Sequence, residues 1–435
     1  MSTEIIKKAN RLKSTKMVSK LVNEYWKDIY QIKETDKLLG YTTGMPINPF
    51  LAAQDMAWIH GEGYGASVAA RHEEKEPQLM SERRGYNREL CSYARTQIGC
   101  AMFADRGIPD DMTPGPIAGS IPKADFIVTA YPGCSSGPQW DWAIQRVFGK
   151  KMPWYNVSVP FHFGRNGGGY MQGPEFREDV AYVVRQLKGL ISFLEEVSGR
   201  PYNWDKLKEL FAYTKKVATV RMEALALCKA KPAPASFFDF TILLSLVNYL
   251  TAWPGSLECM EAVKLEVQDR LKNNITAIPN EKYRLLFMGI MNWNKIGWLA
   301  DKMANYDACV IAGEYTHHAF WNEPDVIDPE DPLEGIAINL LICGNNLGYP
   351  IAEERTMKLC RDYSIDGVLL HTARTCRALV RVQNLYAESL RRKMNISSIM
   401  FEGDMVDDSF YQDDLVNTRI EALLESLDAQ KNRGY

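Results

Sequence analysis

The stretch DFIVTAYPGCSSGPQWDW at residues 125–142 contains the pattern that decides the fold of this chain. It predicts a buried strand over 125–131, then a Pro-Gly turn, and then a helix that begins near Pro138. Similar apolar runs predict further strands at 152–160, 282–290, 307–313, 366–371 and 397–404. Apolar residues at helical spacing predict helices at 176–198, 204–229, 255–273, 292–304, 332–347 and 376–394. Strands that alternate with helices indicate parallel sheets in a doubly wound α/β fold.

The length of the chain, 435 residues, indicates two or three domains, because a single compact core rarely grows so large. The Pro- and Ala-rich stretch KAKPAPAS at 229–236 is the best candidate for a boundary. We therefore expect an N-terminal helical segment at 1–44, a first α/β domain at 45–230 and a second α/β domain at 237–435.

Composition and charge are those of a soluble globular protein, with 46% hydrophobic residues, 24% charged residues and a net charge of −3. So small a net charge gives no electrostatic reason to expect binding to nucleic acid or to an anionic membrane. The N-terminus lacks the apolar run of a secretion signal, and the apolar stretch 237–250 is too short to span a bilayer and reads as a buried helix. We therefore expect a cytoplasmic protein whose nine cysteines are free, metal-bound or reactive.

Two cysteines directly follow predicted strands. Cys134 comes after the strand at 125–131 and Cys376 after the strand at 366–371, each beside an expected helix start. In open α/β sheets, ligands bind beyond the carboxyl ends of the strands, and a helix N-terminus favours a thiolate over a thiol. These two positions therefore suggest a function, whereas an isolated cysteine is usually a small buried hydrophobe.

Cys91 lies early in a predicted helix, and spacing alone leaves it open as a ligand or a core residue. Its neighbour Cys100 is nine residues away, which places the two about 180° apart on an unbroken helix, although Gly99 could break it. Only one of them can then face a shared site. The remaining cysteines fall within predicted helices or an apolar strand and are expected to pack in the core: Cys228, Cys259, Cys309, Cys343 and Cys360.

Glu314, His317 and His318 follow the predicted strand at 307–313 and are candidate proton donors in a cleft. Packing beside the aromatic pair at 320–321 is an equally good interpretation of the histidines. No short CxxC or HxxxH spacing indicates a zinc site.

The glycine-rich stretch FHFGRNGGGYMQG at 161–173 could place backbone amides and Arg165 around phosphates, but a flexible turn is the commoner explanation. It lacks the GxxxxGK[ST] pattern, so we expect no Walker-type ATPase site in this chain. The stretch GEGYGASVAARHEEKEP at 61–77 shows no phosphate-loop spacing either, and its residues 64–69 predict a short strand.

Four segments together resemble the 2-hydroxyacyl-CoA dehydratase/benzoyl-CoA reductase family. They are MPINPFLAAQDMAWIHGEGY at 45–64, NRELCSYAR at 87–95, YPGCSSG at 131–137, and the C-terminal run from HTARTCRALV at 371 to the GDMVD and TRIEA helix. The resemblance extends from about residue 40 to the C-terminus. It implies two Rossmann-like parallel-sheet domains with a [4Fe-4S] cluster in the cleft between them.

The resemblance implies that Cys91, Cys134 and Cys376 hold this cluster and that one iron stays open for substrate. It also implies an acyl-CoA substrate, a homologous cluster-bearing partner subunit, separate ATPase or electron-activating subunits, and ferredoxin as the upstream donor. Hydrolysis of ATP in a partner agrees with the missing P-loop.

Within the family, the resemblance is to the ATP-dependent reductase branch, which dearomatises benzoyl-CoA to a cyclohexadiene-carbonyl-CoA by low-potential electron transfers and protonation. Dehydratase members commonly have Asp after the second cluster cysteine, whereas Ser135 and Ser136 follow Cys134 here. Aromatic residues near the expected site are candidates for a water-excluding wall, namely Tyr131, Trp140, Trp142, Phe161 and Phe163. A 2-hydroxyacyl-CoA dehydratase subunit and a non-catalytic electron-relay subunit are the alternatives.

Overall fold

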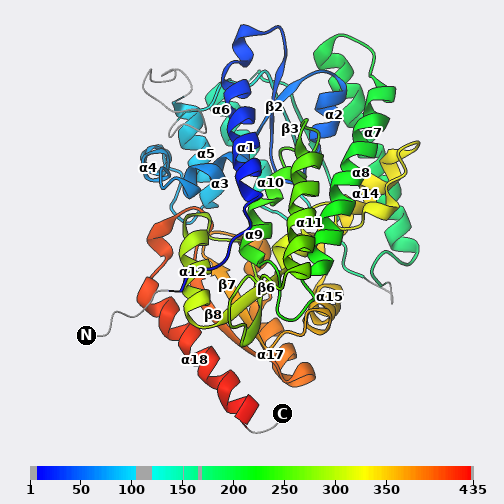
Figure 1. Cartoon of the computed structure of the whole chain (residues 1–435). Coiled ribbons are helices and arrows are strands. Elements are labelled where there is room, and N and C mark those ends of the chain that lie inside the picture. Colours follow the sequence, from blue (N-terminus) through cyan, green and yellow to red (C-terminus); the bar gives the residue numbers. More distant parts are fainter. Residues whose placement is uncertain (1–6, 104–119, 150, 165–168, 433–435) are drawn as a thin grey trace.

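The computed structural model describes residues 7–103, 120–149, 151–164 and 169–432. It contains two four-stranded parallel sheets, with strand orders β2-β1-β3-β4 and β6-β5-β7-β8. The first sheet lies in the upper half of the view in Figure 1 and the second in the lower half. The α/β fold with two Rossmann-like parallel sheets is therefore confirmed.

The first sheet consists of β1 (Leu39–Thr42), β2 (Ala57–His60), β3 (Phe126–Ala130) and β4 (Trp154–Val157). The residues of β1, β2 and β3 are all buried, as expected of parallel strands that are covered by helices on both faces, while the edge strand β4 is mostly half-buried. β3 and β4 confirm two predicted strands. β1 lies inside the range expected to be the N-terminal helical segment, and neither β1 nor β2 was predicted.

The second sheet consists of β5 (Tyr283–Met288), β6 (Ala308–Gly313), β7 (Gly367–Ala373) and β8 (Ser397–Gly403). All four coincide with predicted strands. One buried hydrophobic cluster extends from Leu12 to Val406 and so joins the two halves of the molecule, while a second cluster covers the other face of this sheet.

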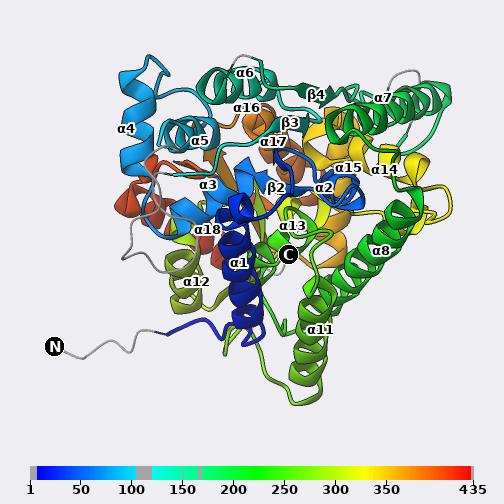
Figure 2. The same cartoon turned by 90° about the horizontal axis from the view of Figure 1, so that it is seen from above.

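The helices before the 229–236 stretch are α1 (Thr15–Tyr30), α2 (Asn48–Ala53), α3 (Gly61–Ala70), α4 (Lys75–Arg83), α5 (Ser92–Met102), α6 (Gly137–Phe148), α7 (Pro174–Ser198) and α8 (Trp204–Leu227). Those after it are α9 (Phe237–Ile242), α10 (Leu244–Val247), α11 (Ser256–Lys272), α12 (Ile296–Asn305), α13 (Glu314–His318), α14 (Pro332–Leu341), α15 (Tyr349–Asp362), α16 (Arg377–Val380), α17 (Gln383–Met394) and α18 (Asp413–Asn432). Short 3-10 turns include η4 (Trp293–Lys295) and η6 (Gly344–Asn346). Figure 2 shows α8 and α11 side by side along one edge of the molecule. Among the described residues, no helix is both long and apolar enough to cross a membrane.

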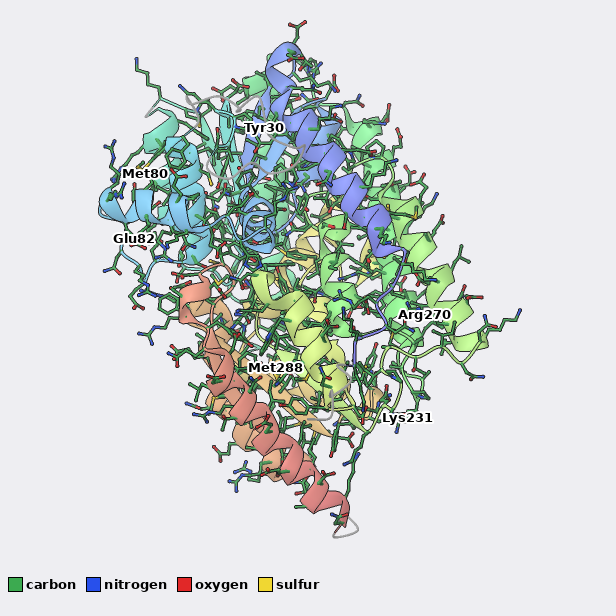
Figure 3. All side chains as sticks on the ribbon, turned by 60° about the vertical axis from the view of Figure 1, so that its left-hand side comes forward. Tyr30, Met80, Glu82, Lys231, Arg270 and Met288 are labelled. Carbon is green, nitrogen blue, oxygen red and sulfur yellow. The ribbon has the colours of Figure 1, made fainter. Side chains whose placement is uncertain are left out.

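The N-terminal segment packs on the second half of the chain before α1 begins. Arg270 of α11 (Figure 3) donates hydrogen bonds to the backbone oxygens of Asn10 and Arg11, at 2.7 and 2.6 Å. Arg11 forms an ion pair of 2.8 Å with Asp239 of α9, which is buried. These contacts fix where α1 starts, so that its buried face can pack beside both halves.

Two local predictions are corrected by the structure. The expected strand at 64–69 is part of helix α3, which His60 caps by accepting a hydrogen bond from the Gly63 N–H at 3.2 Å. The helix can pack closely on α5 because Gly65 has no side chain; a Cβ there would lie 2.8 Å from the Tyr93 ring. The expected single helix at 237–250 is buried as predicted but is divided into α9 and α10 at Leu243.

Candidate functional site

Cys91, Cys134 and Cys376 line one cavity of about 90 Å³, which we call the cysteine cavity. Cys134 follows β3 in the first sheet, Cys376 follows β7 in the second, and Cys91 immediately precedes α5. The structure thus brings together three residues that lie up to 285 positions apart, as the strand-end argument requires for Cys134 and Cys376.

Each of the three thiols lies immediately before or within a few residues of a helix start, with backbone N–H groups directed at the sulfur. The donors are two or three residues further along the chain: Ala94 for Cys91, Ser136 and Gly137 for Cys134, and Leu379 and Ala378 for Cys376. Such N–H···S hydrogen bonds lower the pKa of a thiol and stabilise its thiolate form. All three sulfurs therefore share one local geometry that suits a ligating thiolate.

Burial opposes ionisation and is the larger effect. It raises the pKa of Cys134 to about 11 and that of Cys376 to about 12, and it raises the pKa of Cys91 well above its ordinary value. The neighbouring thiols raise these values further, since Cys134 acts on both Cys91 and Cys376. Three thiolates in this cavity therefore need a positively charged centre to neutralise them.

Cys134 follows Gly133, in a turn that requires a glycine at that position. Gly133 has a φ of 67°, and a Cβ at this position would lie 1.9 Å from the backbone oxygen of Asn345. The Asn345 side chain in turn donates a hydrogen bond of 2.9 Å to the Pro132 oxygen. The turn after β3 is thereby held against the loop that contains η6.

A buried hydrogen-bond chain ties the other two cysteine turns together. The backbone N–H of Ser92 donates to Thr375 Oγ1 at 2.9 Å, and Thr375 Oγ1 donates to Asp404 Oδ2 at 2.6 Å. Ser92 follows Cys91 and Thr375 precedes Cys376, so this chain fixes the distance between the two thiols. All three linking residues are buried.

Three soft sulfur donors suit iron or another thiophilic metal. Among the described residues, no group of three or more His, Cys, Asp or Glu side chains is arranged around a point where one metal ion could bind. The ligands of a cluster need not converge on one point, because each thiolate binds a different iron. The donor set, the backbone N–H groups and the cavity therefore fit a polynuclear iron–sulfur centre better than a single ion.

Two carboxyl groups line the cysteine cavity, Glu62 at the start of α3 and Glu314 at the start of α13. Burial raises the pKa of Glu62 to about 8. Burial also raises the pKa of Glu314 to about 7, although Arg355 and Arg381 partly oppose this shift. Both groups therefore hold a proton at a pH where an ordinary carboxyl group is ionised, which makes them able to donate it.

Glu62 was missed in the sequence. It follows β2, so the strand-end rule that selected Cys134 and Cys376 also applies to it, but β2 itself was not predicted. Glu314 was predicted and does face the cysteines.

His317 and His318 line a different cavity of about 580 Å³, which we call the histidine cavity. It shares no lining residue with the cysteine cavity. His317 Nδ1 lies 3.0 Å from the Gly313 oxygen, and burial lowers the pKa of His317 to about 3 and that of His318 well below its ordinary value. Both rings are therefore neutral, and they line a cavity other than that of the three thiols.

Cys343 also lines the cysteine cavity, contrary to the expectation that it packs within a helix. Helix α14 ends at Leu341, so Cys343 lies in the following turn, where its Sγ contacts Asn345 Oδ1 at 2.6 Å. The other five cysteines are buried away from this cavity, as expected: Cys100, Cys228, Cys259, Cys309 and Cys360.

Five aromatic side chains contribute to the wall of the cysteine cavity. Tyr131 and Trp140 were predicted, and Tyr93, Tyr315 and Phe320 complete the wall. The other predicted aromatics do not line it, and two of them, Trp142 and Phe163, are half exposed. Arg165, the candidate phosphate ligand of the glycine-rich stretch, lies outside the described residues.

Comparison with known proteins gives a consistent result. The family model for the 2-hydroxyglutaryl-CoA dehydratase D-component matches residues 45–427. The chain is 24% identical to the alpha subunit of lactoyl-CoA dehydratase from Anaerotignum propionicum, over 92% of this chain and 93% of that protein. It is 23% identical to the (R)-2-hydroxyisocaproyl-CoA dehydratase alpha subunit of Clostridioides difficile (96% and 97%). It is equally 23% identical to a benzoyl-CoA reductase subunit of Thauera aromatica (99% and 97%).

Proposed function

Since this chain belongs to the 2-hydroxyglutaryl-CoA dehydratase D-component family, we propose that it is the catalytic, cluster-bearing subunit of an aryl-CoA reductase. The coarser statement, that it is a subunit of the CoA-thioester dehydratase or reductase type, follows from the family itself. The reduction of benzoyl-CoA to a cyclohexadiene-carbonyl-CoA is the more specific step that we propose.

One observation supports the proposal most, namely that Cys91, Cys134 and Cys376 meet at one cavity beyond the ends of β3 and β7. We propose that these thiolates hold a [4Fe-4S] cluster and that the fourth iron has no thiolate ligand. A bound cluster of this kind would supply single electrons and a Lewis-acidic iron for the thioester carbonyl.

The aromatic walls have a defined task in this reaction. The first electron added to an aromatic ring destroys the delocalisation of the ring. The reduced ring is therefore high in energy and readily loses this electron to water. Tyr131, Trp140 and Phe320 line the cavity with large side chains and exclude water from it.

The reduced ring must also receive protons. The carboxyl groups of Glu62 and Glu314 face the same cavity and hold protons near neutral pH, so we assign proton donation to them. His317 and His318, which the sequence had suggested for this task, are not assigned, because they line the histidine cavity.

The same comparison supports a multi-subunit assembly. The relatives are each named as one subunit of an enzyme, and we propose that this chain likewise assembles with a homologous subunit that carries its own cluster. The sequence contains no GxxxxGK[ST] motif. We therefore propose that separate ATPase subunits receive electrons from ferredoxin and deliver them to this chain.

A 2-hydroxyacyl-CoA dehydratase is the second candidate, and one observation favours it. Two carboxyl groups line the cysteine cavity, and burial raises the pKa of both, to about 8 for Glu62 and about 7 for Glu314, so that one could act as acid and the other as base. Elimination of water needs one of each. The net electron demand separates the two reactions, since dehydration consumes none and ring reduction consumes one pair for each product.

The experiment is a count of electrons for each turnover. The oxygen-free chain, assembled with its partner and an ATP-dependent electron donor, is supplied with benzoyl-CoA or with a 2-hydroxyacyl-CoA. A dienoyl-CoA product formed with one electron pair supports the reductase. Conversion of the 2-hydroxyacyl-CoA with only trace electron input supports the dehydratase. Conversion of neither substrate would contradict both candidates.

A further inference from the structure

A second cavity, which we call the α1 cavity, meets the cysteine cavity. It has a volume of about 340 Å³ and shares three lining residues with the cysteine cavity: Glu62, Tyr93 and Tyr315. Three other lining residues are exposed and mark its rim: Ser19, Ala70 and Arg71. The α1 cavity therefore extends from the surface to side chains that also border the cysteine cavity.

Helix α3 sets the depth of this passage. Glu62, Ala66 and Ala70 recur every four residues and so lie on one face of the helix, with Glu62 at the inner end and Ala70 at the rim. Eight residues of helix span about 12 Å. An extended chain of about ten atoms covers that distance.

The opposite walls are mainly apolar. Val18 and Val22 of α1, Leu244 of α10 and Ile296 of α12 line the cavity. Small residues on α3, such as Ala66, keep the passage open. A mainly apolar passage of this kind can hold a flexible chain. An amide group buried there without a hydrogen-bond partner would cost free energy of binding.

Asn248 supplies such a partner. Its side chain is 6% exposed and lines the α1 cavity, and its Oδ1 has no hydrogen-bond partner among the described residues. The backbone oxygen of Asn248 accepts hydrogen bonds from Asn48 Nδ2 at 2.8 Å and from Thr251 Oγ1 at 2.7 Å, which fixes the backbone. Asn248 Oδ1 is therefore a buried acceptor without a partner, in a side chain that lines a cavity able to hold an amide N–H group.

We propose that the α1 cavity binds the pantetheine arm of the CoA thioester, with Asn248 hydrogen-bonded to one of the arm's amides and the thioester placed beside Glu62. This inference rests on the proposed function, which supplies the CoA thioester. The sulfur and both amides of the arm fit within the passage, and an asparagine side chain can donate to or accept from an amide. The nucleotide end of CoA stays outside the cavity, on the side of Arg71. Arg71 is the only Lys or Arg among the described residues that line this cavity.

The histidine cavity is the competing route. It is larger and polar, and Arg355 lies over the Tyr170 ring there, 4.4 Å from the ring centroid. It shares no lining residue with the cysteine cavity, whereas the α1 cavity shares three. Of these two cavities, only the α1 cavity borders the cysteine cavity.

The test measures equilibrium binding of benzoyl-CoA to the oxygen-free full chain, with S-ethyl thiobenzoate as a ligand that lacks the amides. Ala66→Trp, which fills the α1 cavity, should abolish benzoyl-CoA binding. Ala226→Trp is the matched control, because Ala226 lines the histidine cavity, and it should bind benzoyl-CoA as the wild type does. Thermal unfolding verifies that both variants are folded.

A second variant tests the same proposal if Ala66→Trp does not fold. Asn248→Ala should weaken benzoyl-CoA binding about fivefold to tenfold, the usual effect of losing one hydrogen bond, and leave S-ethyl thiobenzoate unaffected. Equal weakening of both ligands, or loss of binding in Ala226→Trp but not in Ala66→Trp, would overturn the proposal. Binding needs neither electrons nor ATP, so a failure to reduce benzoyl-CoA would count against the proposed reaction alone.

Discussion

The backbone N–H of Ser92 lies 2.9 Å from Oγ1 of Thr375 and donates a hydrogen bond to it. The two residues are 283 positions apart in the chain, yet one follows Cys91 and the other precedes Cys376. Asp404 completes the link by accepting hydrogen bonds from both the N–H and the Oγ1 of Thr375. The separation of two candidate ligands is thus set by a buried polar contact.

Replacing Thr375 with Val should disturb this link while keeping the shape of the side chain. The Ser92 N–H and one oxygen of Asp404 would each lose a buried partner, so we expect a loss of about 1–3 kcal/mol in the free energy of unfolding. Iron content should fall as well, because the two cysteine turns are no longer held in register. Denaturant unfolding and iron analysis measure both effects. Thr375→Ser, which keeps the hydroxyl group, is the control, and equal iron in the Val and Ser variants would show that the link does not position the thiols.

Replacing Gly133 with Ala should be more damaging than the same change at Gly85. Both glycines have positive φ, which costs an L-residue about 1–2 kcal/mol. At Gly85 a Cβ would meet nothing within 4 Å, whereas at Gly133 it would lie 1.9 Å from the Asn345 oxygen. We therefore expect Gly133→Ala to displace Cys134 and to lose iron. A comparison of unfolding midpoints and iron content checks this, and two variants with the same properties would refute the close approach.

The stability of the protein should depend on the ionisation of Glu62. Burial raises its pKa from an ordinary value of 4.5 to about 8, so the folded protein holds this proton more tightly than the unfolded chain does. The stabilisation is complete below about pH 4.5 and is lost as the pH rises through about 8. Glu62→Gln removes this dependence, so the variant should become progressively more stable than the wild type between these limits. Unfolding at several pH values tests the trend, and the exposed Glu334→Gln should follow the wild type.

Catalytic turnover should depend on Glu62. Glu62→Gln keeps the shape of the side chain but cannot donate the carboxyl proton, so turnover should fall about 100-fold or more. Benzoyl-CoA binding should change little. The wild-type rate should decline above about pH 8, where Glu62 ionises. A Gln variant with wild-type turnover would remove Glu62 from the role of proton donor.

Much of the sheet framework was predictable from the sequence. β3 and β5 to β8 are apolar runs long enough to show a pattern, and the strand-end rule then selected Cys134 and Cys376. Cys91 precedes a helix rather than following a strand, so only the family resemblance pointed to it.

The rest of the site was not found for two reasons. β2 was not predicted, and without it Glu62 could not be recognised as a strand-end carboxyl group. Helix α13 has five residues, with Glu314 at one end and His318 at the other, and periodicity cannot show that they line different cavities. Packing between segments far apart in the chain decides which cavity each of these side chains lines.

The most direct test of the account is the iron content of the oxygen-free protein and of two cysteine variants. A [4Fe-4S] cluster on Cys91, Cys134 and Cys376 requires about four irons for each chain. We expect Cys376→Ala to lose them and Cys228→Ala, which changes a buried residue outside the cysteine cavity, to keep them. Wild-type protein without iron, or equal loss in the two variants, would contradict the cluster assignment.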